Sequence, residues 1–231
     1  MTARVIQDVA ADVQAVIEAE DRPSLDRFNN DLLASRYGHV MLIDGNDPRH
    51  RRGHHDHHPG RDRVHAQQRR HPGCGRAREH LFSRNCAQYQ CRLPSGVTVW
   101  VLLNHFKSQS DADGPKRARQ AAGVRDIVDG LVAAGQRHLV VMGDLNEGPA
   151  AAGQPPANLA PLLDPDSPLV AVYSLPVLDP GPRPGTFQSC GIGNRLDYIF
   201  VSRDLAALVV GRGIERHGLW GGPTNVNPPS Q

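Results

Sequence analysis

The hydrophobic pattern of this chain contains three apolar runs of strand length, each of which meets polar side chains at one end. The runs are VTVWVLLNHFKS, LVVMGDLNEGP and RLDYIFVS. A Gly residue followed by carboxylate and carboxamide side chains at the end of a strand is a common arrangement for binding a metal ion or a phosphate. The polar residues concerned are Asn104, His105 and Lys107 in the first run, Asp144 and Asn146 in the second, and Asp197 in the third.

The rest of the pattern predicts both helices and strands. Helical spacing of apolar residues predicts helices at 3–11, 23–33 and 115–134. Shorter apolar runs predict strands at 13–17 (followed by Glu18), 37–43, 87–93, 97–103, 139–142 and 196–201. Pro94, Ser95 and Gly96 are typical of a hairpin turn between two of these strands. The pattern therefore favours an α/β fold with packed sheets.

Length and composition favour one large domain over residues 1–231. The chain is 39% hydrophobic, and its net charge of +2 says little about partners. The four Cys residues have neither a metal-binding spacing nor the density of a disulfide framework. No apolar span approaches the roughly 20 residues of a membrane helix. The first residues do not resemble a signal peptide, so a cytoplasmic location is expected by default, although an upstream signal could have been lost.

Residues 50–78 do not follow this pattern. Seven of the twelve His residues and eight Arg residues lie in this stretch, with almost no apolar side chain. Such a segment cannot bury a face, so we expect an aberrant or disordered insert. His54, His55, His57 and His58 lie close enough in sequence to share a metal ion, and the Arg residues could neutralise phosphates.

A third interpretation is translation of this segment in the wrong reading frame. The chain has 24 Arg but only two Lys, which is typical of a GC-rich gene. Out-of-frame translation of such genes yields Arg, His, Pro and Gly. A back-translation with free choice of third bases can be read one base later to give an apolar, strand-like run. We expect a compensated frameshift, with a neutral insert and a selected metal or nucleic-acid tract as alternatives.

NHFKS, GDLNEGP and RLDYIFVS, in this order, resemble the endonuclease/exonuclease/phosphatase superfamily of DNase I-like, metal-dependent phosphoesterases. VIEAEDRPSLDRFNNDLL is similar to the early strand and first helix of that family. The resemblance covers most of the chain outside residues 50–78. It implies a four-layer sandwich, in which helices flank two central β-sheets and the active site lies at one end of the sheets.

The resemblance also implies a role for individual residues. Glu18 would bind Mg²⁺ or Mn²⁺, which prefer oxygen ligands. Asp144 and Asn146 would orient the attacking water and the phosphate, and His105 would donate to a phosphate oxygen. Asp197 would hold a catalytic histidine in the correct tautomer. The implied substrate contacts are Asn104, His105 and Asn146.

Each of these residues also has a structural interpretation. The alternatives are a surface carboxylate for Glu18, a simple turn for Asp144 and Asn146, a core network for His105, and an ion pair with Arg195 for Asp197.

Two family motifs have no counterpart in the printed residues: an early strand with Asn, and a final Ser-Asp-His motif that supplies the general base. We therefore expect truncation at both ends. The function that the sequence predicts is hydrolysis of phosphodiesters or phosphomonoesters, with nucleic acid as the expected substrate, no membrane partner and no obligate protein partner. The alternatives are a non-catalytic remnant and a metal-binding module that uses its His tract.

Overall fold

The computed structural model describes residues 2–43, 65–66, 81–82, 84–109, 113–176, 183–188 and 191–215. Its helical elements are α1 (Thr2–Val9), α2 (Arg22–Arg27), the π-helix η1 (Phe28–Leu32), α3 (Gly114–Ala133), η3 (Ala157–Leu159), α4 (Ala160–Leu163), η4 (Val172–Ser174), η5 (Ile192–Asn194) and α5 (Arg203–Ala206). Its strands are β1 (His65–Ala66), β2 (Cys86–Arg92), β3 (Thr98–His105), β4 (Leu139–Asp144), β5 (Leu169–Ala171) and β6 (Asp197–Ser202).

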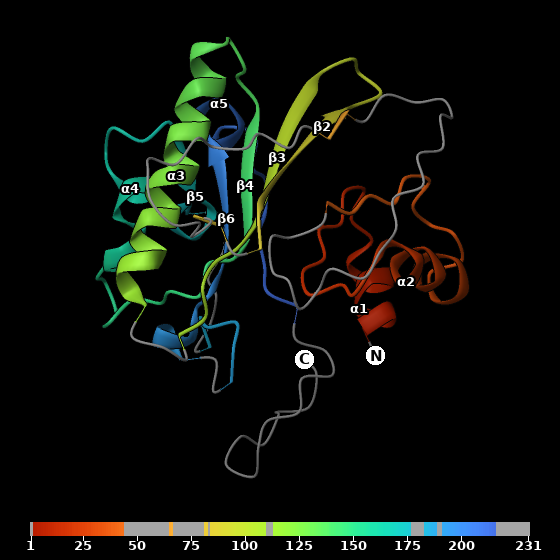
Figure 1. The fold of residues 1–231 in the computed structure, drawn as a ribbon, viewed down its shortest axis with the longest axis horizontal. Coiled ribbons are helices and arrows are strands. Elements are labelled where there is room, and N and C mark those ends of the chain that lie inside the picture. The colour runs from red at the N-terminus through yellow and green to blue at the C-terminus, as the bar shows by residue number, and fades with distance from the viewer. Residues whose placement is uncertain are drawn as a thin grey trace.

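The described strands form one six-stranded sheet in the order β1-β2-β3-β4-β6-β5 (Figure 1). β2 and β3 make an antiparallel hairpin, and the turn at Pro94–Gly96 follows the prediction. β3 and β4 are parallel, and the long helix α3 connects them. β6 runs antiparallel to β4. The carboxyl ends of β3 and β4 and the start of β6 therefore lie at the same edge of the sheet.

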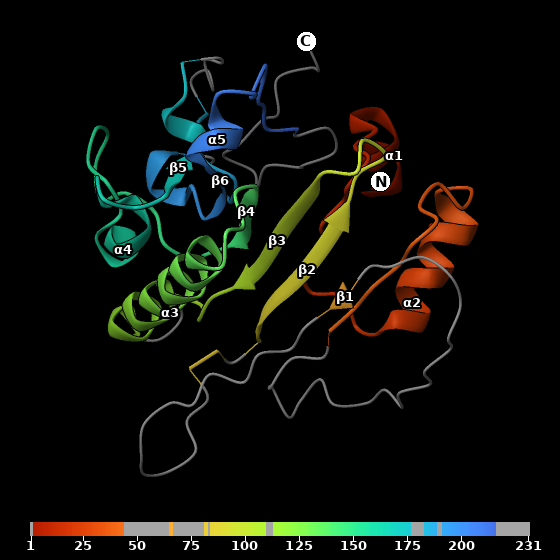
Figure 2. The ribbon, with the colours of Figure 1, turned by 90° about the horizontal axis from the view of Figure 1, so that it is seen from above.

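One face of the sheet carries the hydrophobic core. Leu102, Val141 and Phe200 are consecutive partners across β3, β4 and β6, and all three are fully buried. The helix α3 covers them with a stripe that includes Val124 and Val128, also fully buried. Figure 2 shows α3 and α4 on this side and the N-terminal helices on the opposite side. The predicted helix at 115–134 is confirmed by α3. Its apolar residues repeat at helical spacing, so one face of the helix can be buried.

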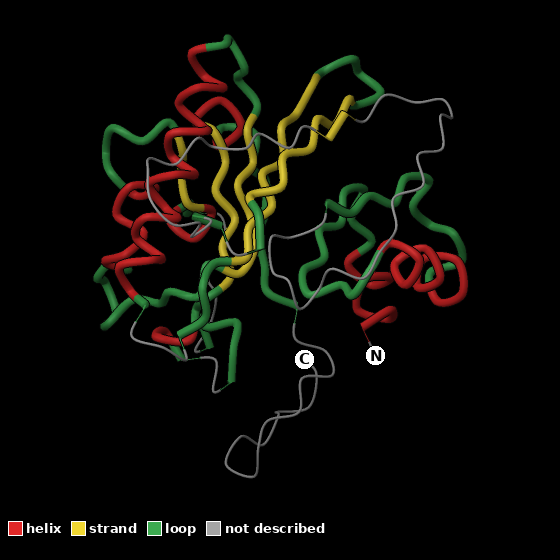
Figure 3. The backbone as a smooth tube through the Cα atoms, in the orientation of Figure 1, coloured by secondary structure: helices red, strands yellow, loops and turns green. Residues whose placement is uncertain are grey.

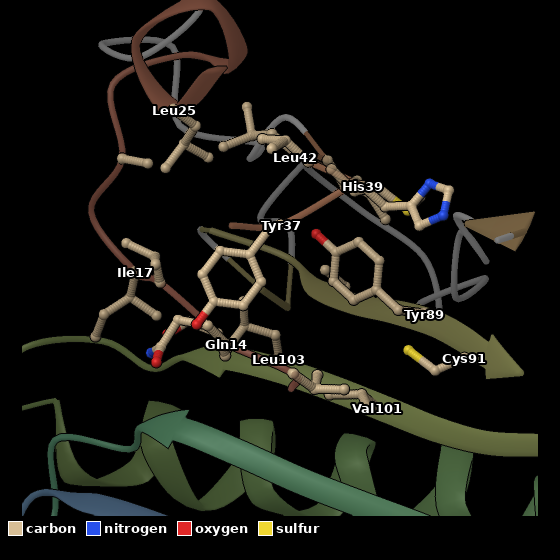
Figure 4. A pocket seen from close by; sticks show the side chains of 18 of the residues that line it. Gln14, Ile17, Leu25, Tyr37, His39, Leu42, Tyr89, Cys91, Val101 and Leu103 are labelled. Atoms are coloured by element: carbon tan, nitrogen blue, oxygen red, sulfur yellow. The ribbon is translucent and has the colours of Figure 1, made fainter. Parts of the chain in front are cut away.

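The opposite face of the sheet looks toward the N-terminal segment across a cavity of about 880 Å³. Figure 4 shows Tyr89, Cys91, Val101 and Leu103 of β2 and β3 on one side of this cavity. Side chains of the N-terminal segment line the other side, among them Ile17, Leu25, Tyr37 and Leu42.

The predictions of strands at 13–17 and 37–43 are wrong. Both segments are irregular, and Figure 3 shows the N-terminal part as helices and loops. Glu18 has a φ of 59°, a left-handed conformation that ends any extended run. A strand needs a neighbour that pairs its backbone groups, and none of the described strands pairs with these segments.

The α/β class is confirmed, whereas the four-layer sandwich stays a prediction, since the described residues form a single sheet. The predicted insert at 50–78 lies outside the described residues except for His65 and Ala66, which pair with Gln90 and Tyr89 as the short strand β1. The three-residue strand β5 was not predicted, because so short a run has no readable period. None of the helices in the described ranges combines the length and the apolar character that membrane crossing requires.

Candidate active site

Three polar residues stand in one row across the edge of the sheet. His105 on β3 is the registered partner of Asp144 on β4, and Asp144 is the registered partner of Asp197 on β6. Registered partners on neighbouring strands point to the same face, and neighbouring strands lie about 4.8 Å apart. The sheet register therefore places an imidazole and two carboxylates side by side, on the face opposite α3.

His105 is the centre of this group. Its Nε2 lies 3.8 Å from Oδ2 of Asp144 and 3.9 Å from Oε1 of Glu18. The side chain of His105 is only 9% exposed, whereas that of Glu18 is 73% exposed. Glu18 comes from the N-terminal segment, which lies over the face of the sheet opposite α3. The structure thus brings together residues that are far apart in the sequence.

Asn146 lies next to this row on the loop after β4. Its φ of 52° is left-handed, a conformation that Asn tolerates better than most residues. The backbone N–H of Asn146 donates to Oδ1 of Asp144 at 2.8 Å, which closes a local turn. Its side-chain Nδ2 donates to the carbonyl of Phe106 at 3.1 Å. Asn146 therefore ties the loop after β4 to the loop after β3.

Gly143 allows this close approach of two strands. Its φ is +130°, and a Cβ atom at this position would lie 1.9 Å from the carbonyl oxygen of Asn104. Only glycine fits here without a shift of the backbone. The Gly that precedes Asp144 thus has a steric reason, which the sequence pattern alone does not reveal.

Burial shifts the protonation of two residues in the row. Burial, together with the charges of Asp197 and Glu18, raises the pKa of Asp144 to about 6, although the hydrogen bond from Asn146 and the charge of Arg84 act against this rise. Burial lowers the pKa of His105, as does the Arg84 guanidinium, while Glu18 and Asp197 oppose this. Near neutral pH the contact between His105 and Asp144 therefore joins a carboxylate to a neutral imidazole, which can still donate one N–H.

Asn104 does not join this group. It is 1% exposed and faces the core under α3, because adjacent residues of a strand point to opposite faces. Its Nδ2 donates to the carbonyl of Leu102 at 3.1 Å. Burial raises the pKa of the neighbouring Cys86 thiol to about 12, so this thiol stays protonated. The expected contact of Asn104 with substrate therefore has no support in this geometry.

Two further residues hold the site, and the sequence pattern did not single them out. Oγ1 of Thr186 accepts hydrogen bonds from the backbone N–H groups of Leu196 and Asp197, both at 3.1 Å. Nη1 of Arg84 donates to the carbonyl of Phe106 at 3.3 Å. Thr186 lies in a loop rich in Pro and Gly, and Arg84 precedes β2, so neither has a periodic signal.

The oxygen donors of this edge suit a hydrated cation. Within the described ranges no three His, Cys, Asp or Glu side chains form a group that could hold a metal ion. Mg²⁺, however, usually keeps several water ligands and binds through one or two carboxylates. Glu18 and Asp144 provide such carboxylates beside His105. The donor set therefore fits a largely hydrated Mg²⁺ or Mn²⁺ and does not fit a dehydrated, four-ligand zinc site.

Three solved structures that resemble parts of this chain come from different organisms. The human Nocturnin catalytic domain with bound sulfate has a TM-score of 0.38 and 19% identity, over 51% of this chain and 40% of that structure. An endonuclease/exonuclease/phosphatase from Beutenbergia cavernae has a TM-score of 0.39 and 24% identity, over 51% of this chain and 31% of that structure. The truncated TDP2 of Caenorhabditis elegans has a TM-score of 0.49 and 15% identity, over 87% of this chain and 74% of that structure.

This chain covers less than half the length of the first of these structures. No curated protein matches the sequence. The sequence profile of the Endonuclease/Exonuclease/phosphatase family, in contrast, matches residues 2–224, which is nearly the whole chain. The chain therefore belongs to the Endonuclease/Exonuclease/phosphatase family.

Proposed function

We propose that this protein hydrolyses phosphate esters with the help of a bound Mg²⁺ or Mn²⁺, and that nucleic acid is its substrate. One observation carries the proposal: Nε2 of His105 lies within 4 Å of carboxylate oxygens from both Asp144 and Glu18. Hydrolysis of a phosphodiester requires neutralisation of charge, positioned donors and an activated water. We also propose that residues 1–231 form one domain and that residues 50–78 are an insert in it.

Each residue of the row, and each of its neighbours Glu18 and Asn146, has a proposed task. A cation held by Glu18 would supply positive charge next to the phosphate. His105 donates its N–H to a phosphate oxygen as negative charge develops there. Asn146 positions the phosphate, and Asp144 orients the attacking water. Asp197 keeps the row in place from β6, where Thr186 holds its backbone.

The electrostatics support these tasks. Because burial raises the pKa of Asp144 only to about 6, its side chain is mostly a carboxylate at neutral pH and can accept a hydrogen bond from water. Because the pKa of His105 is lowered, its imidazole is neutral and acts as a hydrogen-bond donor rather than as a cation. Family membership supports phosphate-ester chemistry in general. The fold does not distinguish nucleic acid from other phosphate esters. Nucleic acid is the substrate that the sequence analysis expects, and the experiment below tests it.

The test uses the purified full chain with supercoiled plasmid DNA and with bis(p-nitrophenyl) phosphate, in Mg²⁺ or in Mn²⁺. Asp144→Ala removes the carboxylate at the centre of the row. Asp126→Ala removes an exposed carboxylate on α3 and is the matched control. We expect both substrates to be cleaved by the wild type and by Asp126→Ala, and neither by Asp144→Ala.

Equal cleavage by all three proteins would point to a contaminant and would refute the proposal. Cleavage of bis(p-nitrophenyl) phosphate without cleavage of DNA would keep the chemistry and refute nucleic acid as the substrate. Cleavage of neither substrate by the wild type would favour a non-catalytic remnant or a metal-binding module.

A further inference from the structure

The two loops that hold the site residues are anchored by a buried ion pair outside the row. Nε of Arg117, in the first turn of α3, lies 2.6 Å from Oε2 of Glu147. The two side chains are only 9% and 13% exposed. Glu147 directly follows Asn146 on the loop after β4. A buried pair of this kind adds little net stability, since removal of water from both charges offsets much of their attraction.

Arg117 also reaches the other loop. Its Nη1 donates to the carbonyl of Ser108, three residues after His105, at 3.3 Å. One planar guanidinium therefore connects the loop after β3 to the loop after β4. Lysine, a point charge on a flexible stem, cannot reproduce this fork.

Glu147 is held from two further directions, and the next residue, Gly148, is also confined. Its Oε1 accepts from Nδ2 of Asn158 at 2.9 Å, and its backbone carbonyl accepts from the Tyr198 hydroxyl at 2.9 Å. Gly148 passes so close to Gly193 that an added Cβ would lie 2.1 Å from the Gly193 carbonyl oxygen. With both carboxylate oxygens engaged, the residue after Asn146 has little room to move.

A second residue of α3 supports the same loops. Gln120, one turn after Arg117, is fully buried and accepts the backbone N–H of Lys107 through its Oε1 at 2.9 Å. Between the two loops, Asn146 donates to the carbonyl of Phe106. The left-handed φ of Asn146, which Asn tolerates better than most residues, belongs to this same anchored loop.

We propose that Arg117, acting through Glu147, is a positioning residue that sets the placement of Asn146 relative to His105. This inference rests on the proposed function. Neither side chain is placed against the phosphate, so neither is a catalytic residue. The pair acts on the rate, because a misplacement of about 1 Å at a reacting centre can cost about 100-fold.

The first measurement is steady-state hydrolysis of bis(p-nitrophenyl) phosphate in Mg²⁺. We expect Arg117→Ala to lower kcat by about 10- to 100-fold, with a change in KM below about twofold. Arg117→Lys should recover only part of kcat. In a double-mutant cycle, Arg117→Ala with Glu147→Ala should lose little more than either single variant, since the two residues act as a unit.

Two controls separate positioning from general stability. Val128→Ala removes buried volume from the same helix. The Val128 side chain makes no hydrogen bond to either loop. Arg137→Ala breaks an Arg–Asp pair of similar length, 2.9 Å to Asp204, that is exposed. Both should keep the wild-type kcat per folded molecule. Equal loss of kcat in Arg117→Ala and in Val128→Ala at equal loss of Tm would overturn the inference.

The second measurement does not depend on activity. We expect amide hydrogen exchange of Lys107 and Asn146 to accelerate in Arg117→Ala and not in Val128→Ala. Unchanged exchange in Arg117→Ala would refute the positioning role. If the wild type hydrolyses no substrate while the exchange result holds, the proposed function fails and the anchoring of the loops by Arg117 stands.

Discussion

Asp144 on β4 and Asp197 on β6 are direct cross-strand partners, so two carboxylates face the same side of the sheet at one edge. Like charges placed opposite each other in a sheet are unfavourable. Burial and this repulsion together raise the pKa of Asp144. This arrangement therefore costs stability, and that cost can be measured.

We expect Asp144→Asn to stabilise the protein above pH 6. The pKa of Asp144 rises from 3.8 to about 6 on folding, so the folded state binds this proton more tightly than the unfolded state. The resulting contribution to stability is complete below about pH 3.8 and is lost as the pH rises through about 6. Asn carries no charge and keeps an oxygen that can accept from the Asn146 N–H.

Urea unfolding with EDTA at pH 4, 6 and 8 checks this prediction. Asp144→Asn should exceed the wild type by up to about 3 kcal/mol at pH 8, and the difference should fall below about 1 kcal/mol at pH 4. Asp126→Asn, which removes an exposed carboxylate of α3, is the control for a change in surface charge. A difference that does not vary with pH would contradict the role assigned to burial.

Gly143→Ala should destabilise the fold strongly. An added Cβ would meet the Asn104 carbonyl, and a φ of +130° is unfavourable for any residue with a Cβ. We expect a loss of about 3 kcal/mol or more in the free energy of unfolding. Gly130→Ala on α3 is the control, because no atom lies within 4 Å of its added Cβ, and helix propensity favours Ala by about 0.5 to 1 kcal/mol.

Thermal unfolding of both variants provides the measurement. Gly143→Ala should lower Tm and Gly130→Ala should leave it unchanged or raise it. Equal Tm values for Gly143→Ala and the wild type would show that the two strands can separate without penalty at this point.

His105→Asn should lower the rate of phosphodiester hydrolysis. Loss of one positioned donor to a developing oxyanion typically costs about 10²- to 10³-fold in kcat. His138→Asn is the control, since His138 immediately precedes β4, at the end of the strand away from Asp144. The measurement is kcat of both variants in steady-state kinetics. Equal kcat values for His105→Asn and His138→Asn would contradict the proposed role of His105.

Glu18→Gln should raise the Mg²⁺ concentration needed for half-maximal activity. A carboxamide keeps an oxygen but loses the charge that holds a hard cation. The affinity for Mg²⁺ should fall by more than about tenfold. Loss of a residue that only hydrogen-bonds to a metal ligand already costs about 10- to 100-fold in metal affinity. Glu20→Gln, an exposed carboxylate two residues further along, serves as the control. Titration of activity with Mg²⁺ after treatment with EDTA would show an unchanged curve if Glu18 binds no cation.

The pattern of apolar and polar residues was sufficient to predict the elements with a clear period. α3 and the hairpin of β2 and β3 follow local rules of spacing and turn chemistry, so their sequences specify them. The same pattern found the three strand ends with polar residues. Alternation along β3 would also have placed Asn104 and His105 on opposite faces, had it been applied to the site residues.

Only the tertiary structure decided how these ends combine. The register between β3, β4 and β6 sets His105, Asp144 and Asp197 in one row, and register depends on pairing between distant segments. The same limit explains the failure at 13–17, where an apolar run was read as a strand although strands exist only with a partner. The sequence determined which residues can do chemistry and where strands and helices can form. The packing of distant segments decided which of those residues meet.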